Sequence, residues 1–354
     1  NNLLEVYHNL VEIREMVINE QRPFLLECMT FRMRGHEEAS GTKYVPKHLF
    51  EEWGPKDPVQ NFENYLENIG VLTGNKHLEI KLDYKHRIND SLKIAGAVEE
   101  ILADIETEEN DVYASNESIQ HEVSLEAPKS KKRLIDAVSD GLRISMQKHK
   151  NLVVMGQDIA EYGGVFKITE GFLEEFGKER IRNTPICESA IVGAALGLSI
   201  NGFKSVVEMQ FADFVTCGFN QIINNLAKSK YRWDQIVDVV VRMPTGAGVA
   251  AGPFHSQSNE AWFFHTPGLK VVYPSTPYAA KGLLIAAIED PNPIMFFEHK
   301  ALYRSIEEEI PDEFYSLEIG KARIVQPGDD ITVVAYGMAV HWVQNFIKEN
   351  VDVL

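Results

Sequence analysis

One acidic residue, Glu188, opens a stretch that is otherwise almost wholly apolar, "ESAIVGAALGLSI". A carboxylate in such a setting is costly unless it is paired, protonated or used in chemistry. The alternative is an acid that only complements the positive end of its own helix. The stretch alone leaves both interpretations open.

Two histidines lie among glycine, serine and charged residues, outside any clear apolar face. They are His255 in "GPFHSQSN" and His36 in "FRMRGHEEASG". Catalytic groups favour loops held by a rigid scaffold, so both are candidates for proton transfer. The alternative for each is an ordinary exposed or packing histidine.

A glycine-rich loop, "TGAGVAAGP", precedes His255. Its spacing does not fit the dinucleotide pattern GxGxxG, and Pro253 with His255 follows where a helix would be required. The glycines more readily permit a tight active-site loop.

The elements that must position these residues form an α/β pattern. Apolar, β-branched runs alternate with segments long enough for helices, such as 214–231 and 277–290. Continuous rather than alternating apolar strands predict a parallel sheet covered on both faces, with ligands at the carboxyl ends of its strands. The predicted strands are "LVVMGQD", "SVVEMQF", "IVDVVVRMP", "LKVVYPST" and "PIMFF".

Composition indicates which kinds of partner the protein can bind and in which cellular compartment it works. The formal charge of −17 and the pI near 5.1 argue against nucleic acid or an anionic membrane as the main partner. No apolar run reaches the ~20 residues that span a bilayer. The three cysteines, Cys28, Cys187 and Cys217, have no paired spacing, so we expect a reduced, cytoplasmic compartment.

Charge and periodicity suggest where the domains divide. Residues 84–105 carry apolar positions at helical spacing, which predicts a helix. Beyond them, 106–130 is acidic, polar and without clear periodicity, and we expect a solvated tether rather than the charged face of a longer helix. A strand–helix pair is predicted from residue 329 onward, and both ends of the chain look cut, as in an internal fragment.

Long motifs in two parts of the chain resemble one enzyme family. "TPICESAIVGAALGLSINGFKSVVEMQFADF", "GPFHSQSNEAWFFHTPGLKVVYPSTPYAAKGLL", "AIEDPNPIMFFEHKALYR" and "IGKARIVQPGDDITVVAYG" resemble the beta subunit of thiamin-diphosphate-dependent 2-oxo acid dehydrogenases. "PFLLECMTFRMRGHEEASG" and "EEWGPKDPVQNFENYL" resemble the C-terminal part of the alpha subunit. The chain thus looks like an internal piece of a fused alpha–beta polypeptide.

The resemblance implies a domain plan. Residues 1–105 correspond to part of the alpha-type diphosphate-binding domain, and 106–130 to the acidic linker. Residues 131–318 correspond to the beta-type, transketolase-like pyrimidine-binding domain. Residues 319–354 correspond to the start of a truncated C-terminal domain.

The resemblance also implies roles for the candidate residues. Glu188 matches the acid that hydrogen-bonds a ring nitrogen of the cofactor's aminopyrimidine and favours its imino tautomer. His255 and His36 match two active-site histidines, which suit proton transfer or acyl transfer to a lipoyl group. Phe214 matches the aromatic that packs against the aminopyrimidine.

Four further residues are implied with less defined roles. Gln210 lies near the pyrimidine motif, and Arg32 matches a loop arginine whose alternative is an ordinary salt bridge. Asp290 and Asn292 match a loop that can hold a monovalent cation such as potassium, and their alternative is a capping turn.

Two departures from the family pattern matter. The Gly-Asp-Gly to Asn motif, which holds magnesium and the diphosphate, lies outside this chain, so we expect the chain alone to bind the cofactor poorly. Glu37 follows His36 where kinase-regulated relatives carry a phosphorylatable serine, so we expect no regulation by phosphate there.

The resemblance predicts oxidative decarboxylation of a 2-oxo acid, with branched-chain substrates favoured and pyruvate or acetoin as alternatives. The acyl group would pass to a lipoyl-bearing acyltransferase. A transketolase-like synthase and a non-catalytic, oligomerising fragment are the other hypotheses. We also expect a homodimer of the fused chain, because Ala190, Gly193, Ala194 and Gly197 would let another helix approach; the alternative is close packing on its own sheet.

Overall fold

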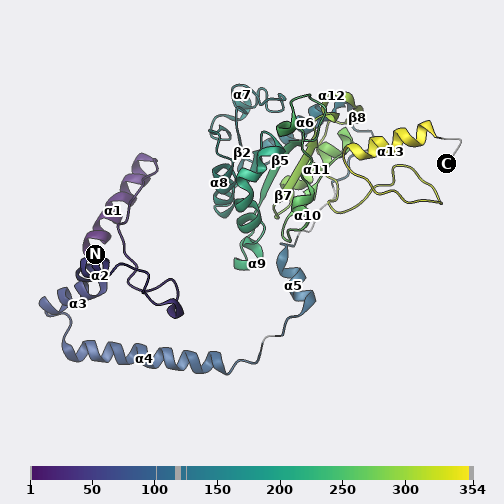
Figure 1. Ribbon diagram of the computed structural model, residues 1–354. Helices are drawn as coiled ribbons and strands as arrows, with labels where there is room; N and C mark the ends of the chain where they lie inside the picture. Colours follow the sequence, from purple (N-terminus) through teal and green to yellow (C-terminus); the bar gives the residue numbers. More distant parts are fainter. Residues whose placement is uncertain (1, 101, 116–120, 125, 351–354) are drawn as a thin grey trace. The chain divides into compact units, whose positions relative to one another are not determined.

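The computed structural model describes residues 2–100, 102–115, 121–124 and 126–350 (Figure 1). The chain divides into two units, 1–101 and 102–354. No helix in the described part of the chain is both long enough and apolar enough to cross a membrane.

The regular structure of the first unit is helical. Thr73 begins its longest helix by accepting a hydrogen bond from the N–H of Lys76, and Asp57 caps the preceding helix in the same way. No described residue of this unit is fully buried, so its helices do not close a core of their own. The helices are α1 (Leu3–Glu20), α2 (Lys47–Trp53), α3 (Pro58–Asn68) and α4 (Gly74–Gly96), with 3-10 turns at Glu38–Ser40 and Gly54–Lys56.

The second unit is built on a six-stranded parallel sheet, which confirms the predicted fold class. The strand order is β3-β2-β4-β5-β7-β6. All five strands predicted from apolar runs are present. The strands are β2 (Leu152–Gly156), β3 (Ile181–Asn183), β4 (Lys204–Glu208), β5 (Val239–Thr245), β6 (Lys270–Val272) and β7 (Ile294–His299).

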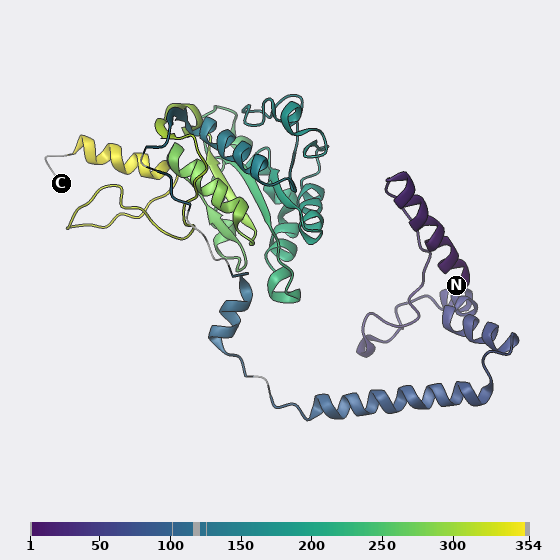
Figure 2. The ribbon, with the colours of Figure 1, turned by 180° about the vertical axis from the view of Figure 1, so that it is seen from behind.

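Helices cover both faces of this sheet, because side chains alternate between the faces along each strand. Val206, Val240 and Phe296 face one side, where they share a core with α6 (Leu134–Lys148) and α11 (Pro277–Glu289). Figure 2 shows these two helices side by side over the sheet. Val207 and Val241 face the other side, against α8 (Glu188–Ile200).

Shorter elements complete the unit. Residues 214–231, predicted as one helix, instead contain the end of a 3-10 helix, Ala212–Gly218, then a π-helix, Gln221–Leu226, and α9 (Ser229–Trp233). The others are α7 (Phe172–Phe176), a 3-10 turn at Pro253–His255, α10 (Ala261–Phe264), α12 (Leu302–Ser305) and α13 (Met338–Glu349).

A two-stranded antiparallel sheet joins β1 (Lys129–Arg133) to β8 (Glu307–Pro311). Lys131 lies opposite Glu309, and Lys132 lies opposite Glu308. The basic run "KSKKR" is therefore a strand that faces an acidic partner strand, an arrangement that opposite charges stabilise.

Two predicted elements differ from the structure. The helix expected over 84–105 begins earlier and ends at Gly96, since its start signal is Thr73. No described strand pairs with residues 329–337, where a strand was expected, and Val334 is 87% exposed. An isolated strand leaves its backbone groups unpaired, so sequence propensity alone does not form one.

The expected tether over 106–130 is in part ordered and attached. The helix α5 (Ile105–Val112) begins at Asp104, whose carboxylate accepts a hydrogen bond from the N–H of Thr107. Ala114 is buried, and the Asn292 amide binds its N–H at 2.8 Å and its C=O at 2.9 Å. The expectation of a wholly solvated tether is therefore wrong for this part, while 116–120 and 125 lie outside the described residues.

Replacing Asn292 with alanine should release residues 105–114, because the backbone groups of Ala114 would lose both partners. We expect faster amide hydrogen exchange and earlier proteolysis in this segment. Asn224→Ala, at an exposed position, is the control. Unchanged protection of 105–114 in Asn292→Ala would contradict the attachment.

Candidate active site

The predicted acid, Glu188, is the first residue of α8 and is only 8% exposed. Its Oε1 atom accepts one hydrogen bond, of 3.3 Å, from the amide of Gln157, which directly follows β2. Its other carboxylate oxygen accepts none from the described residues. Glu188 thus keeps acceptor capacity inside a buried setting, a combination that a purely structural acid does not need.

An aromatic cluster forms where β4 ends. The chain turns from Glu208 into the 3-10 helix that carries Phe214. The rings of Phe211 and Phe214 both meet the His255 ring edge to face, at centroid distances of 5.2 and 5.5 Å. The structure therefore brings Phe214 and His255 together.

This cluster is joined to the helix of Glu188 by close packing. A Cβ atom added at Gly218, the last residue of the 3-10 helix, would lie 3.4 Å from the Glu188 carbonyl oxygen. Gln210 precedes the helix, and its amide nitrogen is buried without a hydrogen-bond partner among the described residues. The Glu188 carboxylate accepts its hydrogen bond from Gln157, and the structure gives it none from Gln210 or His255.

The loop after β5 is held by its backbone. Gly246 has a φ of +78°, and a Cβ atom there would lie 2.3 Å from the His299 ring, so only glycine fits this turn. The carbonyl of Gln257 accepts hydrogen bonds from the N–H of Gly246 and the hydroxyl of Thr245, and its own N–H donates to Asp213. These contacts fix the loop that carries His255.

A buried amine lies on the same edge of the sheet. Lys300, which follows β7, is 4% exposed, and its Nζ atom has no hydrogen-bond partner among the described residues. It lies over the Phe211 ring, 5.1 Å from the centroid. Burial lowers the pKa of Lys300 to about 8, although the negative charge of Asp213 opposes this shift. Burial and the Lys300 charge also lower the pKa of His299.

Below this edge lies a buried ionic network. Arg242, in the middle of β5, is fully buried and donates to Glu208 on β4 at 2.8 Å and to both carboxylate oxygens of Glu298 on β7. The Tyr303 hydroxyl donates to Glu298 at 2.7 Å. Burial raises the pKa of Glu208, although the Arg242 charge opposes this shift. Burial and the Glu298 charge raise the pKa of Tyr303.

The predicted alpha-type residues lie in the other unit. Arg32 and His36 are both exposed, in a segment without regular secondary structure, and the backbone N–H of His36 donates to the Tyr44 hydroxyl at 2.8 Å.

The residues of the predicted cation loop, Asp290 and Asn292, bond to each other and to neighbouring protein groups. Asp290 accepts hydrogen bonds from the backbone and side-chain N–H groups of Asn292 and forms an ion pair of 2.6 Å with Lys270. The Asn292 amide also holds Ala114. These contacts favour the capping turn over a cation site. Among the described residues, Glu63, Glu67 and His77 are grouped closely enough to share a metal ion, but His77 already bonds Glu63 at 2.6 Å.

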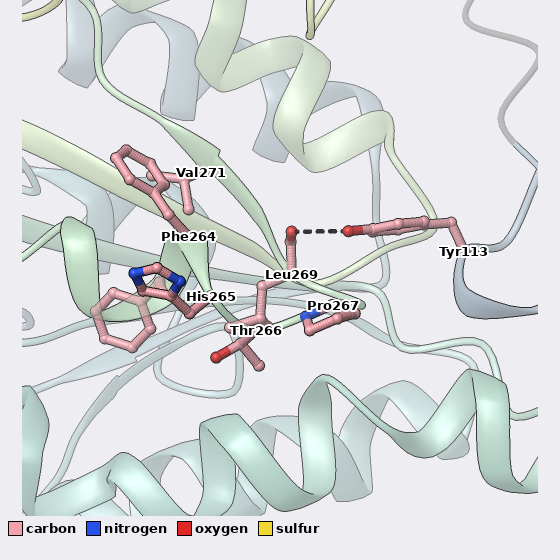
Figure 3. A pocket seen from close by; sticks show the side chains of 8 residues that line it. Tyr113, Phe264, His265, Thr266, Pro267, Leu269 and Val271 are labelled. Carbon is pink, nitrogen blue, oxygen red and sulfur yellow. Dashed lines mark hydrogen bonds between the residues drawn. The ribbon is translucent and has the colours of Figure 1, made fainter. Parts of the chain in front are cut away.

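A surface pocket of about 380 Å³ lies elsewhere in the second unit (Figure 3). The Tyr113 hydroxyl at its rim donates to the carbonyl of Leu269 at 3.4 Å. None of the predicted site residues lines this pocket, whose walls are Tyr113, Phe263, Phe264, His265, Thr266, Pro267, Leu269 and Val271.

The sequence interpretation missed Gln157, Phe211, Asp213, Lys300 and the Arg242 network. For the network a signal was available: Glu208, Arg242 and Glu298 are each a lone charge inside an apolar strand. No sequence signal indicated Asp213, because its carboxylate accepts a hydrogen bond from the backbone of Gln257, 44 positions away.

Comparison with known proteins confirms the resemblance. Residues 130–305 match the family described as "Transketolase, pyrimidine binding domain", and residues 1–102 match "Dehydrogenase E1 component". Both matches fall on the segments whose motifs indicated the family.

Individual relatives agree with this assignment. The chain is 49% identical over 210 residues, 59% of its length, to "2-oxoisovalerate dehydrogenase subunit beta" of Bacillus subtilis. It is 46% identical over 61% of its length to the mitochondrial protein of that name from Dictyostelium discoideum, and 44% identical over 59% to "Pyruvate dehydrogenase E1 component subunit beta" of B. subtilis. It spans 64%, 59% and 65% of these relatives' lengths.

Among solved structures, "Split gene transketolase, inactive beta4 tetramer" matches with a TM-score of 0.50 and 21% sequence identity. The match covers 62% of this chain and 67% of that one. At this identity the likeness shows the fold alone.

Removing the cation of the buried network should destabilise the protein strongly. Arg242→Met leaves Glu208 and Glu298 buried without their counter-charge, which we expect to lower the free energy of unfolding by about 3–5 kcal/mol. Urea unfolding measures the change, and Arg323→Met, at an exposed position, is the control. A loss below about 1 kcal/mol would show that the network is not stabilising.

Lys300→Met should instead raise the stability at neutral pH. Burial of the charged wild-type amine is unfavourable, and its pKa of about 8 lies below the 10.5 of an exposed lysine. The unfolded chain therefore binds more protons between pH 8 and 10.5, and wild-type stability rises with pH over this window. The advantage of Lys300→Met should be largest below pH 8 and disappear above 10.5. An advantage that does not change with pH, or one matched by the exposed control Lys178→Met, would refute this.

Proposed function

We propose that this chain, a member of the dehydrogenase E1 family with a transketolase pyrimidine-binding domain, provides the pyrimidine-binding half of a thiamin-diphosphate-dependent 2-oxo acid dehydrogenase. The proposal rests on the setting of the Glu188 carboxylate. It is buried, lies at the first turn of an apolar helix, and has one long hydrogen bond.

The residues present fit the aminopyrimidine part of the cofactor. The free oxygen of Glu188 can accept a hydrogen bond from a ring nitrogen, and a site poor in water strengthens this bond. Phe211 and Phe214 offer aromatic surface for a flat ring. The residues for magnesium and the diphosphate are expected outside this chain, so it would hold one end of the cofactor only.

When bound, thiamin diphosphate would supply the thiazolium ring that takes up the electron pair left on the substrate carbon when carbon dioxide departs. Glu188 holds a proton at the pyrimidine nitrogen and so sets the tautomer. His255, whose ring contacts two phenylalanine rings, is proposed to give or take a proton at the substrate. His36 of the alpha-type segment is proposed as a second proton carrier, and Arg32 of that segment as a cofactor-binding loop residue.

The substrate is proposed to be a branched-chain 2-oxo acid. The two relatives named for 2-oxoisovalerate are 49% and 46% identical, and that named for pyruvate is 44% identical. Acyl transfer to a lipoyl group of an acyltransferase would complete the reaction, in the cytoplasm. Comparing kcat/KM for 3-methyl-2-oxobutanoate and pyruvate distinguishes the two substrates.

The fused chain is proposed to act as a dimer. Ala190, Ala194 and Gly197 of α8 are exposed on one helix face, and small residues let a second helix approach closely. Sedimentation of the complete enzyme tests this. A stable monomer that is fully active would contradict it.

Glu188→Gln in the complete enzyme should lower the rate of carbon dioxide release by about 10²–10⁴-fold, since an amide cannot hold or release the proton. Folding should be unchanged, as judged by circular dichroism and the melting temperature. The control is Glu174→Gln, at an exposed position. Wild-type turnover in Glu188→Gln would reject the role of this acid.

A further inference from the structure

We propose that Asp213 is a positioning residue for His255, a role that rests on the proposed function and adds a residue to its site. Asp213 does not touch His255. It acts through the backbone of Gln257, two residues further along the same loop.

The first support is the hydrogen bond itself. Asp213 is 6% exposed, and its Oδ1 atom accepts from the Gln257 N–H at 3.0 Å. A buried bond between a carboxylate and a backbone N–H is among the stronger hydrogen bonds in proteins. It joins two segments 44 residues apart, the 3-10 helix of Phe214 and the loop of His255.

The second support is that the other side of Gln257 is held as well. Its carbonyl accepts from the N–H of Gly246 at 2.8 Å and from the Thr245 hydroxyl at 3.0 Å. Thr245 ends β5, so the carbonyl side is fixed to the sheet. Asp213 supplies the bond on the N–H side. The Asn259 amide, two residues further along, adds a second bond to the same 3-10 helix by donating to the Ala212 carbonyl at 2.8 Å, so the Asp213 bond is the one nearer to His255.

The third support is what the bond aligns. Asp213 is the immediate neighbour of Phe214, whose ring meets the His255 ring at 5.5 Å and 80°. Gln257 is two residues from His255. The hydrogen bond between Asp213 and Gln257 therefore helps to fix the distance between the aromatic that would pack on the pyrimidine and the histidine that would move the proton.

The backbone of the His255 loop is flexible enough to need a hydrogen bond that holds it in place. Residues 246, 248, 250 and 252 all have positive φ values, and three of them are glycines, which lose the most entropy when ordered. Misplacement of a catalytic group by about 1 Å can cost ~10²-fold in rate. The loop thus needs a fixed contact close to His255.

The negative charge of Asp213 and the acceptor function of its Oδ1 atom have different effects. Its second oxygen, Oδ2, is buried and has no hydrogen-bond partner among the described residues. Its negative charge acts on the nearby ammonium group of Lys300. Positioning needs only the Oδ1 acceptor, which an asparagine side chain would also offer.

This difference gives the test. In the complete enzyme, Asp213→Ala should lower kcat by about 10–100-fold with a smaller change in the KM for the 2-oxo acid. Asp213→Asn should restore most of the loss. The activity-independent readout is the rate at which diethyl pyrocarbonate modifies His255, followed by mass spectrometry. We expect faster modification in Asp213→Ala and a rate near that of the wild type in Asp213→Asn.

Site-resolved hydrogen exchange gives a second readout that does not depend on Asp213→Ala being folded. The Gln257 amide should be protected in the wild type and in Asp213→Asn, relative to the amides of Ser256 and Ser258. A wild-type rate of His255 modification in Asp213→Ala, an unprotected Gln257 amide, or an Asp213→Asn variant as impaired as Asp213→Ala would each overturn the proposal. A wild type that releases no carbon dioxide would reject the proposed function instead, and the modification and exchange results would still decide the positioning role.

Discussion

The central strands of the second unit are held by the buried guanidinium of Arg242. Arg242 joins β5 to its two neighbours, β4 through Glu208 and β7 through Glu298. Glu208 and Glu298 carry like charges on the two strands that flank β5, and the guanidinium between them bonds both in fixed geometry. The spacing of β4, β5 and β7 is thereby set at the middle of β5, close to the carboxyl ends of β4 and β7.

The candidate site lies directly beyond the ends of those three strands. β4 leads to Gln210, Asp213 and Phe214, β5 leads to the loop of His255, and β7 leads to His299 and Lys300. Each group is attached to its neighbour by short contacts, from the edge-to-face rings to the bonds around Gln257. Glu188 enters from a different direction, at the first turn of α8, packed against the last residue of the Phe214 helix. The site is thus built from loops whose starting points are rigid, as is usual for parallel sheets.

The sequence predicted the elements that depend on local pattern. Five strands were identified because their apolar residues are continuous. Phe214 and His255 were singled out because their motifs are long, and their roles remain proposals. The helix expected at 84–105 was misplaced because its beginning depends on Thr73, outside the periodic stretch. The strand expected near residue 331 does not pair, since pairing needs a neighbour that the pattern of one segment cannot supply. The bond from Asp213 to Gln257 and the pairing of Arg242 with two acids depend on strand order and register, which exist only in the assembled fold.

The central claim is that Glu188 faces the pyrimidine ring of the cofactor. A structure of the complete enzyme with thiamin diphosphate and magnesium measures this directly. We predict a Glu188 carboxylate oxygen within hydrogen-bonding distance, about 2.6–3.2 Å, of a ring nitrogen of the aminopyrimidine. A Glu188 carboxylate more than about 4 Å from the ring, or a pyrimidine bound by a different acid, would contradict it.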